Sequence, residues 1–349
     1  MIYFDNQNNL NSKYYFVIEK EEKMTGKIVG MGVYVPAYSM DNHKLEEYVD
    51  TTDEWIRERT GIKRRYIAGE GETTTDMAIK AAQNAMKEAQ IKADALDLII
   101  VATVSSFDVL PSTACMVQDA LDAVNATCFD ISAACSGFMY AYNTVQAYMK
   151  GGLCKNALII GSETLSNIVD WEDRGTCILF GDGAGAALIS LSNGKDYIPI
   201  THSSGALGGA LTLKNRFVGN GIQTKRKINY DKAPYFMKMD GQAVFKFAVS
   251  KVPEVIEEVL EANHIQKHEI ACYALHQANG RIIEAVARRL KEPKEKFPVN
   301  VEKYGNTSSA SIPLLLKEMR DKKIAKKGDK VVMAGFGAGL TWGACIFEW

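Results

Sequence analysis

Short apolar runs alternate with segments whose apolar residues recur at helical spacing along most of this chain. The runs at 28–35, 96–103 and 157–160 are strand-sized and predict buried strands. The segment 73–88 places Met and Ala on one face and predicts a helix capped by Thr75. Alternation of this kind is typical of an α/β fold, in which helices pack on a sheet.

A polar stretch rich in Ser, Asn, Gly and Lys at 192–197 separates this series from a second one. The second series predicts helices at 242–262, 280–290 and 311–319 and strands at 270–275, 330–333 and 344–347. Each series ends in a Gly-rich turn and a short apolar strand, which indicates a duplicated fold. We therefore expect an N-terminal half at 24–195 and a C-terminal half at 196–349. A basic stretch at 212–231 predicts an exposed loop.

Charge gives no indication of a nucleic-acid or membrane partner, because 41 Lys and Arg residues nearly balance 42 Asp and Glu residues. A small-molecule enzyme fits this composition better. No apolar run in the sequence approaches the roughly 18 residues of a membrane-spanning helix, so we expect no membrane segment. Residues 1–23 are polar and lack the apolar block of a signal peptide; we expect a disordered arm or an alternative start.

Seven cysteines in no paired pattern indicate a reducing, cytoplasmic compartment rather than a disulfide framework or a metal site. One of them, Cys135, stands in a turn of small residues between an apolar strand ending at Ile131 and a helix expected at 140–150. The N–H groups and the dipole at a helix start favour a thiolate, so the position predicts a lowered thiol pKa and a nucleophile. The alternative is a small buried hydrophobic residue.

Two more polar residues stand in comparable places, His276 in ALHQANGRI and Asn306 in YGNTSSASIP. We expect each to end a strand and precede a helix, where side chains of an α/β sheet face the crevice that binds ligands. Taken alone, His276 is more often a structural histidine, and Asn306 a turn former or helix cap. Together with Cys135 they form a Cys/His/Asn set.

A further candidate region is the charged segment TTDEWIRERTGIKRRYI at 51–67. Asp53 can cap a short helix there. The segment sets one large aromatic residue, Trp55, among the cationic residues Arg57, Arg59, Arg64 and Arg65. An indole stacks a purine base and guanidinium groups pair with phosphate oxygens, so the segment predicts a nucleotide platform. The alternative is a solvated helix with a core-facing Trp.

Several motifs in this chain resemble, in their order and residues, those of β-ketoacyl-acyl-carrier-protein synthase III, one of the thiolase-fold condensing enzymes. They are TTDEWIRERTGI, FDISAACSGF, the MxGxxVFKFAV form at 239–249, HQAN, YGNTSSASIP and GFGAGLTWG. The likeness covers 27–349. It implies a five-layer αβαβα fold with a duplicated core, a homodimer, and the condensation of an acyl-CoA primer with malonyl-acyl-carrier protein, which initiates fatty acid synthesis.

By this resemblance, Cys135 accepts the acyl group from acyl-CoA as a thioester. The backbone N–H groups of Cys135 and of Ala338, in the last Gly-rich turn, would form the oxyanion hole. His276 and Asn306 would donate hydrogen bonds to the enolate that malonyl-acyl-carrier protein forms when it loses carbon dioxide. No metal or redox cofactor is implied, and coenzyme A enters only as part of the substrate.

The resemblance also implies a coenzyme A site. Trp55 and Arg174 would lie on either side of the adenine, with Arg59 near the phosphates. Asn279 of HQAN corresponds to a pantetheine contact.

Two features concern the partners of the reaction. Arg281, Arg288 and Arg289 recur at helical spacing and would meet an acidic carrier protein, the alternative being a solvated basic helix face. Leu110 occupies the position whose side chain, in the family, reaches across the dimer to the end of the acyl pocket and is often Phe. Because leucine is smaller and more flexible than phenylalanine, we expect tolerance of short or branched primers beyond acetyl.

Other classes of protein remain open at this point. A related thiolase-fold enzyme could prime a polyketide or other secondary pathway, whereas a hydroxymethylglutaryl-CoA synthase would want a glutamate acid/base that no matching motif supplies. A non-catalytic acyl-CoA or carrier-protein scaffold is disfavoured by the intact Cys135, His276 and Asn306. A redox-sensing thiol protein would need a resolving cysteine, for which Cys128 is the candidate.

Overall fold

The computed structural model describes residues 24–214 and 236–349, which form two main sheets. The first sheet has the strand order β1-β7-β6-β4-β5. Its strands are β1 Met24–Tyr34, β4 Leu98–Ala102, β5 Thr127–Ile131, β6 Asn156–Glu163 and β7 Gly183–Asn193. The second sheet has the order β11-β12-β13-β8. Its strands are β8 Ile200–Ser203, β11 Ile270–Leu275, β12 Lys330–Gly337 and β13 Thr341–Glu348.

Both sheets are mixed in a similar way. In the first, β4 pairs in parallel with β5 and β6, while β7 runs antiparallel to β6 and β1. In the second, β11 and β12 are parallel, and β13 runs antiparallel to β12 and β8. The similar order supports a duplicated fold.

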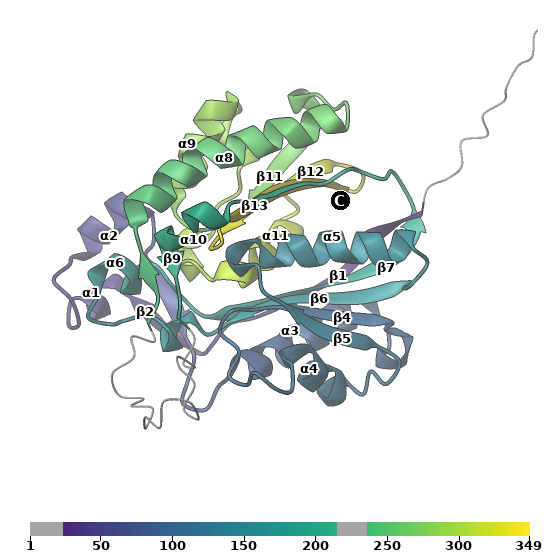
Figure 1. Cartoon of the computed structure of the whole chain (residues 1–349), viewed down its shortest axis with the longest axis horizontal. Coiled ribbons are helices and arrows are strands. Elements are labelled where there is room, and N and C mark those ends of the chain that lie inside the picture. Colours follow the sequence, from purple (N-terminus) through teal and green to yellow (C-terminus); the bar gives the residue numbers. More distant parts are fainter. Residues whose placement is uncertain (1–23, 215–235) are drawn as a thin grey trace, which may run out of the picture.

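The two sheets sandwich a layer of helices (Figure 1). This layer contains α5 (Gly137–Lys150) and α11 (Ser311–Asp321). The central core contains apolar residues of both helices and both sheets, among them Ile100, Phe138, Leu315 and Met333. Because a sheet covers each of these helices on two sides, both helices have many buried residues and little exposed surface.

Further helices cover the outer face of each sheet and complete five layers (Figure 1). Helices α3 (Thr74–Ala89) and α4 (Thr113–Leu121) pack on the first sheet, and α8 (Gly241–Ala262) and α9 (Gly280–Leu290) pack on the second. The predicted αβαβα fold is therefore confirmed. The division at 195 and 196 stays a prediction, since the central core joins both halves.

A group of short elements lies at one end of the layers (Figure 1). It contains β2 Tyr38–Asp41, β3 Arg64–Ile67, α1 Asn42–Leu45, α2 Asp53–Thr60, α6 Arg174–Cys177 and α10 Val301–Tyr304. Two further short strands pair with each other, β9 Leu211–Thr212 and β10 Lys238–Met239. The 3₁₀ turns are η1 Ala93–Ala95, η2 Ala134–Ser136, η3 Leu165–Asn167, η4 Gly205–Ala210, η6 Lys267–Glu269, η7 Lys294–Lys296 and η8 Ser308–Ala310.

Two predicted helix caps are wrong by one or two residues. Helix α3 is capped by Thr73 and not by Thr75, because Thr73 and Asp76 exchange side-chain and backbone hydrogen bonds in a capping box. Helix α2 is capped by Thr52, whereas Asp53 is its first residue.

Two other expectations fall on segments that the structure does not describe. The arm expected at 1–23 lies outside the described residues, as does most of the loop expected at 212–231.

Candidate active site

Cys135 lies in η2, between the end of β5 and the start of α5, as the sequence predicted. The preceding Ala134 has φ +45°, a left-handed conformation that is costly for any residue with a Cβ and that concentrates at functional sites. Gly137 opens α5 at a point where an added Cβ would lie 2.8 Å from Cβ of Ala102. The absence of a side chain at Gly137 therefore lets the Cys135 turn pack closely on the end of β4.

The expectation of a lowered thiol pKa is wrong. Burial raises the pKa of Cys135 to about 12, and the nearby Glu163 carboxylate raises this pKa further, while a hydrogen bond with the Ser308 side chain acts to lower it. The sequence placed the thiol at a helix start, but it gave no sign of how completely the site is buried. Burial therefore favours the protonated thiol over the thiolate at this position.

The end of β12 faces the backbone of Cys135. A Cβ added to Gly337 would lie 2.7 Å from the Cys135 backbone nitrogen, so glycine keeps the space beside this N–H open. Ala338 follows, and it is not among the described residues with positive φ, so its Cβ is compatible with the turn. Gly339, with φ +143°, adopts a conformation open only to glycine.

His276 follows β11 and is buried with its Nδ1 atom 2.6 Å from Oγ of Ser311. Ser311 Oγ also accepts the backbone N–H of Gln277 at 3.4 Å, so its hydroxyl proton is free to point at Nδ1. Burial lowers the pKa of His276 to about 3. The imidazole is therefore neutral near pH 7, and a Ser311 hydroxyl that donates to Nδ1 leaves the ring N–H at Nε2.

Asn306 does not end a strand, contrary to the prediction, because the short helix α10 precedes it. Its backbone forms an isolated bridge with Phe180, and its N–H donates to the carbonyl of Leu179 at 2.8 Å. Its side-chain Oδ1 accepts the backbone N–H of Ser308 at 2.9 Å. This hydrogen bond fixes which way the carboxamide faces and leaves its Nδ2 group to donate elsewhere.

One segment of the C-terminal half, 306–311, links the three candidate residues. It contains Asn306 itself, its turn η8 packs against the turn η2 that holds Cys135, and it supplies the Ser311 hydroxyl to His276. Ser308 has φ +49°, which is a second left-handed non-glycine residue at this site. The sequence predicted the Cys/His/Asn set but missed both serines, since hydroxyls in a YGNTSSASIP turn are ordinary turn formers.

Sequence reasoning also missed Glu163, the last residue of β6. Its carboxylate is fully buried and accepts hydrogen bonds from η8 and from the residues after β4. An acidic residue three positions after the apolar run at 157–160 was the available signal.

Part of the predicted nucleotide platform comes together at the surface. Arg65 does not belong to it, because its side chain is fully buried and donates to Asn42 Oδ1 and to the backbone carbonyl of Ile178.

Two guanidinium groups lie over the indole of Trp55 in α2, with the Cζ atom of Arg59 4.6 Å and that of Arg174 4.8 Å from its ring centroid. Arg174 also donates to the backbone carbonyl of Asp50 at 2.7 Å. These contacts are cation–π interactions, and they place an indole and two cations on one face.

Asn279 connects this platform to α9. Its Nδ2 donates to the backbone carbonyl of Arg59 at 3.0 Å, and its Oδ1 accepts the N–H of Arg281 and caps α9. The pantetheine contact expected of Asn279 stays a prediction, and its role as the cap of α9 is an addition that the sequence did not reveal.

The three arginines of α9 are exposed but differ in their surroundings. Arg281 lies over the ring of Phe245, and Arg289 turns toward α8, where it contacts Glu254 at 3.2 Å and the backbone carbonyl of Val249. Arg281 and Arg288 are seven residues apart and share one face of α9. The predicted stripe is thus formed mainly by these two.

Leu110 is 85% exposed, and its neighbours Phe107 and Val109 are 75% and 72% exposed. They precede α4, beside β5 at the edge of the first sheet. An apolar cluster of this kind next to an open strand edge indicates an interaction surface.

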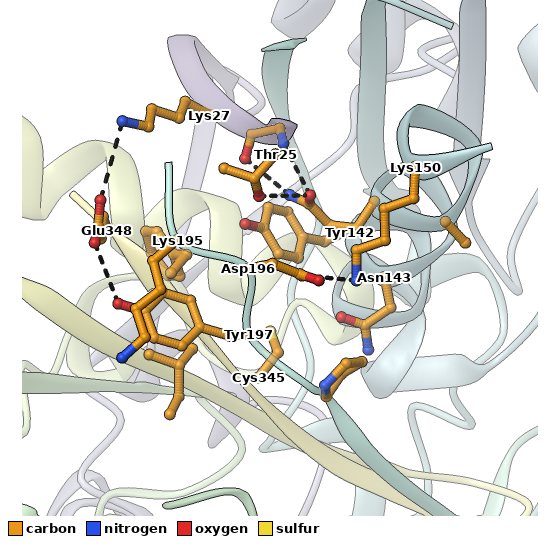
Figure 2. A pocket seen from close by; sticks show the side chains of 16 residues that line it. Thr25, Lys27, Tyr142, Asn143, Lys150, Lys195, Asp196, Tyr197, Cys345 and Glu348 are labelled. Atoms are coloured by element: carbon orange, nitrogen blue, oxygen red, sulfur yellow. Dashed lines mark hydrogen bonds and ion pairs between the residues drawn. The ribbon is translucent and has the colours of Figure 1, made fainter. Parts of the chain in front are cut away.

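A separate cavity lies between α5 and the end of β13 (Figure 2). Figure 2 shows Lys150 paired with Asp196, and Glu348 lying between Lys27 and Tyr197. None of the candidate site residues lines it.

Neither a cluster of metal-binding side chains nor a membrane-spanning helix is present in residues 24–214 and 236–349. No group of three or more His, Cys, Asp or Glu residues within these ranges could hold a metal ion. None of the helices in the same ranges is long and apolar enough to cross a membrane.

Comparison with known proteins places this site in a family. Two family models match, 3-oxoacyl-[acyl-carrier-protein (ACP)] synthase III at residues 129–206 and the C-terminal region of the same enzyme at 260–349. A β-ketoacyl-[acyl-carrier-protein] synthase III of Clostridium novyi is 47% identical over 93% of this chain and 98% of its own length. The fold and site thus define a thiolase-fold condensing acyltransferase.

Solved structures agree. A 3-oxoacyl-[acyl-carrier-protein] synthase III from Aquifex aeolicus is 45% identical, covers 93% of this chain and all of its own, and superposes with a TM-score of 0.85. The priming β-ketosynthase of the R1128 polyketide pathway also gives 0.85 over 93% of this chain and 96% of its own, at 31% identity. The chain belongs to the β-ketoacyl-acyl-carrier-protein synthase III family.

Proposed function

We propose that the enzyme transfers an acyl group from acyl-CoA to Cys135 and then condenses it with malonyl-acyl-carrier protein. The products would be a 3-ketoacyl-carrier protein, coenzyme A and carbon dioxide. The single observation that carries this proposal is the 306–311 segment, which packs against the Cys135 turn, contains the carboxamide and hydrogen-bonds to the imidazole.

In the first half-reaction, the Cys135 sulfur attacks the acyl carbonyl, the C–S bond to coenzyme A breaks, and the thiol proton leaves. The backbone N–H groups of Cys135 and Ala338 would stabilise the oxyanion of the tetrahedral intermediate. The space that Gly337 leaves beside the Cys135 nitrogen supports this assignment.

In the second half-reaction, the malonyl thioester loses carbon dioxide and negative charge develops on its carbonyl oxygen. Neutral His276, through Nε2–H, and Asn306, through Nδ2, would donate hydrogen bonds to this oxygen. A donor that remains neutral can stabilise the enolate without protonating its carbon. The enolate carbon then attacks the acyl group, and the Cys135 sulfur leaves.

Coenzyme A would bind with its adenine between Trp55 and Arg174 and its phosphates near Arg59. The guanidinium of Arg174 now lies over the indole, so it must move aside to admit the adenine ring. Asn279, which holds the backbone of Arg59, would contact the pantetheine arm that leads inward to Cys135.

The exposed apolar cluster around Leu110 supports a homodimer in which this side chain enters the partner's acyl pocket. Pairing of the open edge of β5 with that of a second copy would cover the cluster. Light scattering of the purified protein tests this assembly, and a monomer at micromolar concentration would contradict it.

The carrier protein, the cofactor requirement and the location complete the proposal. Arg281 and Arg288 would meet the acidic carrier protein. The reaction needs neither a metal nor a redox cofactor, because the thioesters carry the reactive groups, and we expect it to take place in the cytoplasm.

Mass spectrometry after incubation with a panel of acyl-CoAs tests the first half-reaction. The native chain should gain the mass of one acyl group, and Cys135→Ala should gain none. Cys128→Ala is a matched control that should still be acylated, because Cys128 lies on β5, outside the site. Acylation of Cys135→Ala, or an adduct mapped to another cysteine, would contradict the proposal.

A further inference from the structure

The Glu163 carboxylate, at the end of β6, is fully buried and joins segments that lie far apart in the chain. Its Oε1 atom accepts the hydroxyls of Ser308 at 3.0 Å and Ser309 at 2.9 Å, both in η8. Its Oε2 atom accepts three groups from the segment after β4, which are the Val104 N–H at 3.1 Å and the hydroxyls of Thr103 at 3.2 Å and Ser105 at 2.5 Å. One carboxylate therefore ties η8 to the ends of two strands of the first sheet.

The close approach of η8 to β6 depends on Gly161. A Cβ added to this glycine would lie 2.3 Å from the carbonyl oxygen of Ser309, so only glycine leaves room for the turn. Ser308 and Ser309 are both buried at this contact. Buried hydroxyls need hydrogen-bond partners, and the Glu163 carboxylate supplies one to each serine.

Ser308 connects Glu163 to Asn306. Its hydroxyl donates to Glu163 Oε1, and its backbone N–H donates to Asn306 Oδ1 at 2.9 Å. Its φ of +49° costs free energy in a residue with a Cβ, so the turn needs contacts that hold it in this conformation. The hydrogen bond to Glu163 is such a contact, and it fixes the direction of the N–H that Asn306 receives.

This N–H determines which end of the Asn306 carboxamide is left for substrate. A carboxamide accepts through its oxygen and donates through its nitrogen. With Oδ1 bound to Ser308, Nδ2 is the free end; a side chain that turned over would present an acceptor, which repels a developing negative charge. The backbone of Asn306 is held separately, because its N–H donates to the Leu179 carbonyl at 2.8 Å and its carbonyl accepts the Gly181 N–H at 3.1 Å.

We propose that Glu163 is a positioning residue for decarboxylation. It anchors Ser308, whose backbone N–H holds the Asn306 carboxamide with Nδ2 toward the thioester oxygen of the malonyl group. This inference rests on the proposed role of Asn306 in the second half-reaction. Acyl transfer to Cys135 does not use the carboxamide, so loss of the anchor should slow decarboxylation and leave acylation in place.

Glu163→Met removes the anchor while it keeps a side chain of similar length. A thioether is only a weak acceptor, so the Ser308 hydroxyl loses its partner. The kcat for decarboxylation of malonyl-carrier protein should fall about tenfold or more, because a misplaced donor stabilises the transition state less. The KM for the same substrate should stay within about twofold of native. Decarboxylation at the native rate would overturn the proposal.

Glu163→Gln is the matched variant, because it removes the charge and keeps a link to Ser308. The Val104 N–H can only donate, so the glutamine oxygen has to face it, and the glutamine nitrogen then donates to the Ser308 hydroxyl. Glu163→Gln should therefore decarboxylate about tenfold faster than Glu163→Met. Equal rates in the two variants would show that the charge matters and not the anchor, and would overturn the proposal.

Ser308→Gly tests the anchor from the other side and carries the test if Glu163→Met fails to fold. Glycine adopts φ +49° readily and keeps the backbone N–H, but it lacks the hydroxyl that Glu163 holds. Its kcat for decarboxylation should also fall about tenfold. Ser309→Ala is the control, since it removes a hydroxyl from the same oxygen of Glu163 and should stay within about threefold of native. An equal loss in Ser309→Ala, or none in Ser308→Gly, would contradict the proposal.

A double-mutant cycle with Asn306→Ala separates positioning from general damage to the site. If Ser308 acts through the carboxamide, Ser308→Gly should change the residual decarboxylation of Asn306→Ala by less than about twofold. A further tenfold fall in the double variant would overturn the proposal. A native chain that becomes acylated but releases no carbon dioxide from malonyl-carrier protein would instead refute the proposed second half-reaction, and this inference with it.

Discussion

The Nδ1 atom of His276 lies 2.6 Å from the Oγ atom of Ser311, and this contact joins β11 to the first residue of α11. It fixes the plane of the ring, and with the Ser311 hydroxyl as donor the proton of the neutral ring lies on Nε2. The serine therefore decides how His276 presents a donor to substrate.

Ser311→Ala should weaken malonyl-carrier decarboxylation while acylation of Cys135 persists. The ring loses the hydrogen bond that orients it, which costs about 1–3 kcal/mol for a buried polar group. Release of carbon dioxide from labelled malonyl-carrier protein measures decarboxylation, and mass spectrometry measures acylation of Cys135. Equal loss of both half-reactions would contradict a role confined to His276.

Stability should fall at acid pH because His276 is buried in its neutral form. Burial lowers the pKa of His276 to about 3, below the value of about 6.5 in an unfolded chain. The folded state then binds fewer protons, so this contribution is complete above about pH 6.5 and is lost progressively as the pH falls toward 3.

Urea unfolding near pH 7 and pH 5 measures this effect. His276→Gln should show a smaller loss of unfolding free energy between the two pH values than the native chain does. His43→Gln, which changes an exposed histidine, should behave like the native chain. If His276→Gln and the native chain lost the same amount, the neutral buried imidazole would not be the cause.

Arg288→Glu should weaken productive binding of malonyl-carrier protein by about tenfold at low salt, and the effect should shrink at high salt. Arg289→Glu is the matched control, since Arg289 already contacts Glu254 of α8 and should affect the carrier less. The KM for each substrate measures the difference, with acyl-CoA expected to be unaffected by Arg288→Glu. If Arg289→Glu raised the KM for malonyl-carrier protein more than Arg288→Glu did, the carrier protein would not bind the proposed face of α9.

Leu110→Phe should shift the primer preference toward acetyl-CoA. A bulkier ring at the end of the partner's acyl pocket should lower turnover of isobutyryl-CoA relative to acetyl-CoA by about tenfold, as an extra carbon or two in an apolar pocket does. Val109→Phe changes an exposed apolar neighbour and should leave the ratio unaltered. Negligible isobutyryl turnover by the native chain would remove the basis of this prediction.

Local patterns predicted the layers well, because burial on a sheet or between sheets leaves a direct mark on hydrophobic spacing. The alternation of strands and helices, the turn that presents Cys135 and the place of His276 after β11 all followed from such patterns. The caps of α2 and α3 were misplaced because several Thr and Asp residues stand side by side and only backbone geometry selects one.

Contacts between distant segments left no comparable mark. The segments β6, η8 and η2 are far apart in the sequence but meet in the fold. Only this contact brings Asn306, the serines at 308 and 311, and the carboxylate of Glu163 to the site. The thiol pKa was predicted with the wrong sign for the same reason, since a helix start is visible in sequence and complete burial is not.

The most direct test of the account measures the two half-reactions separately in Asn306→Ala. The carboxamide is held by Ser308 and would act only on the malonyl enolate, so decarboxylation should fall by about a hundredfold or more while Cys135 is still acylated. Decarboxylation that continues at the native rate, or an acylation step lost in equal measure, would contradict a site in which these side chains divide the work.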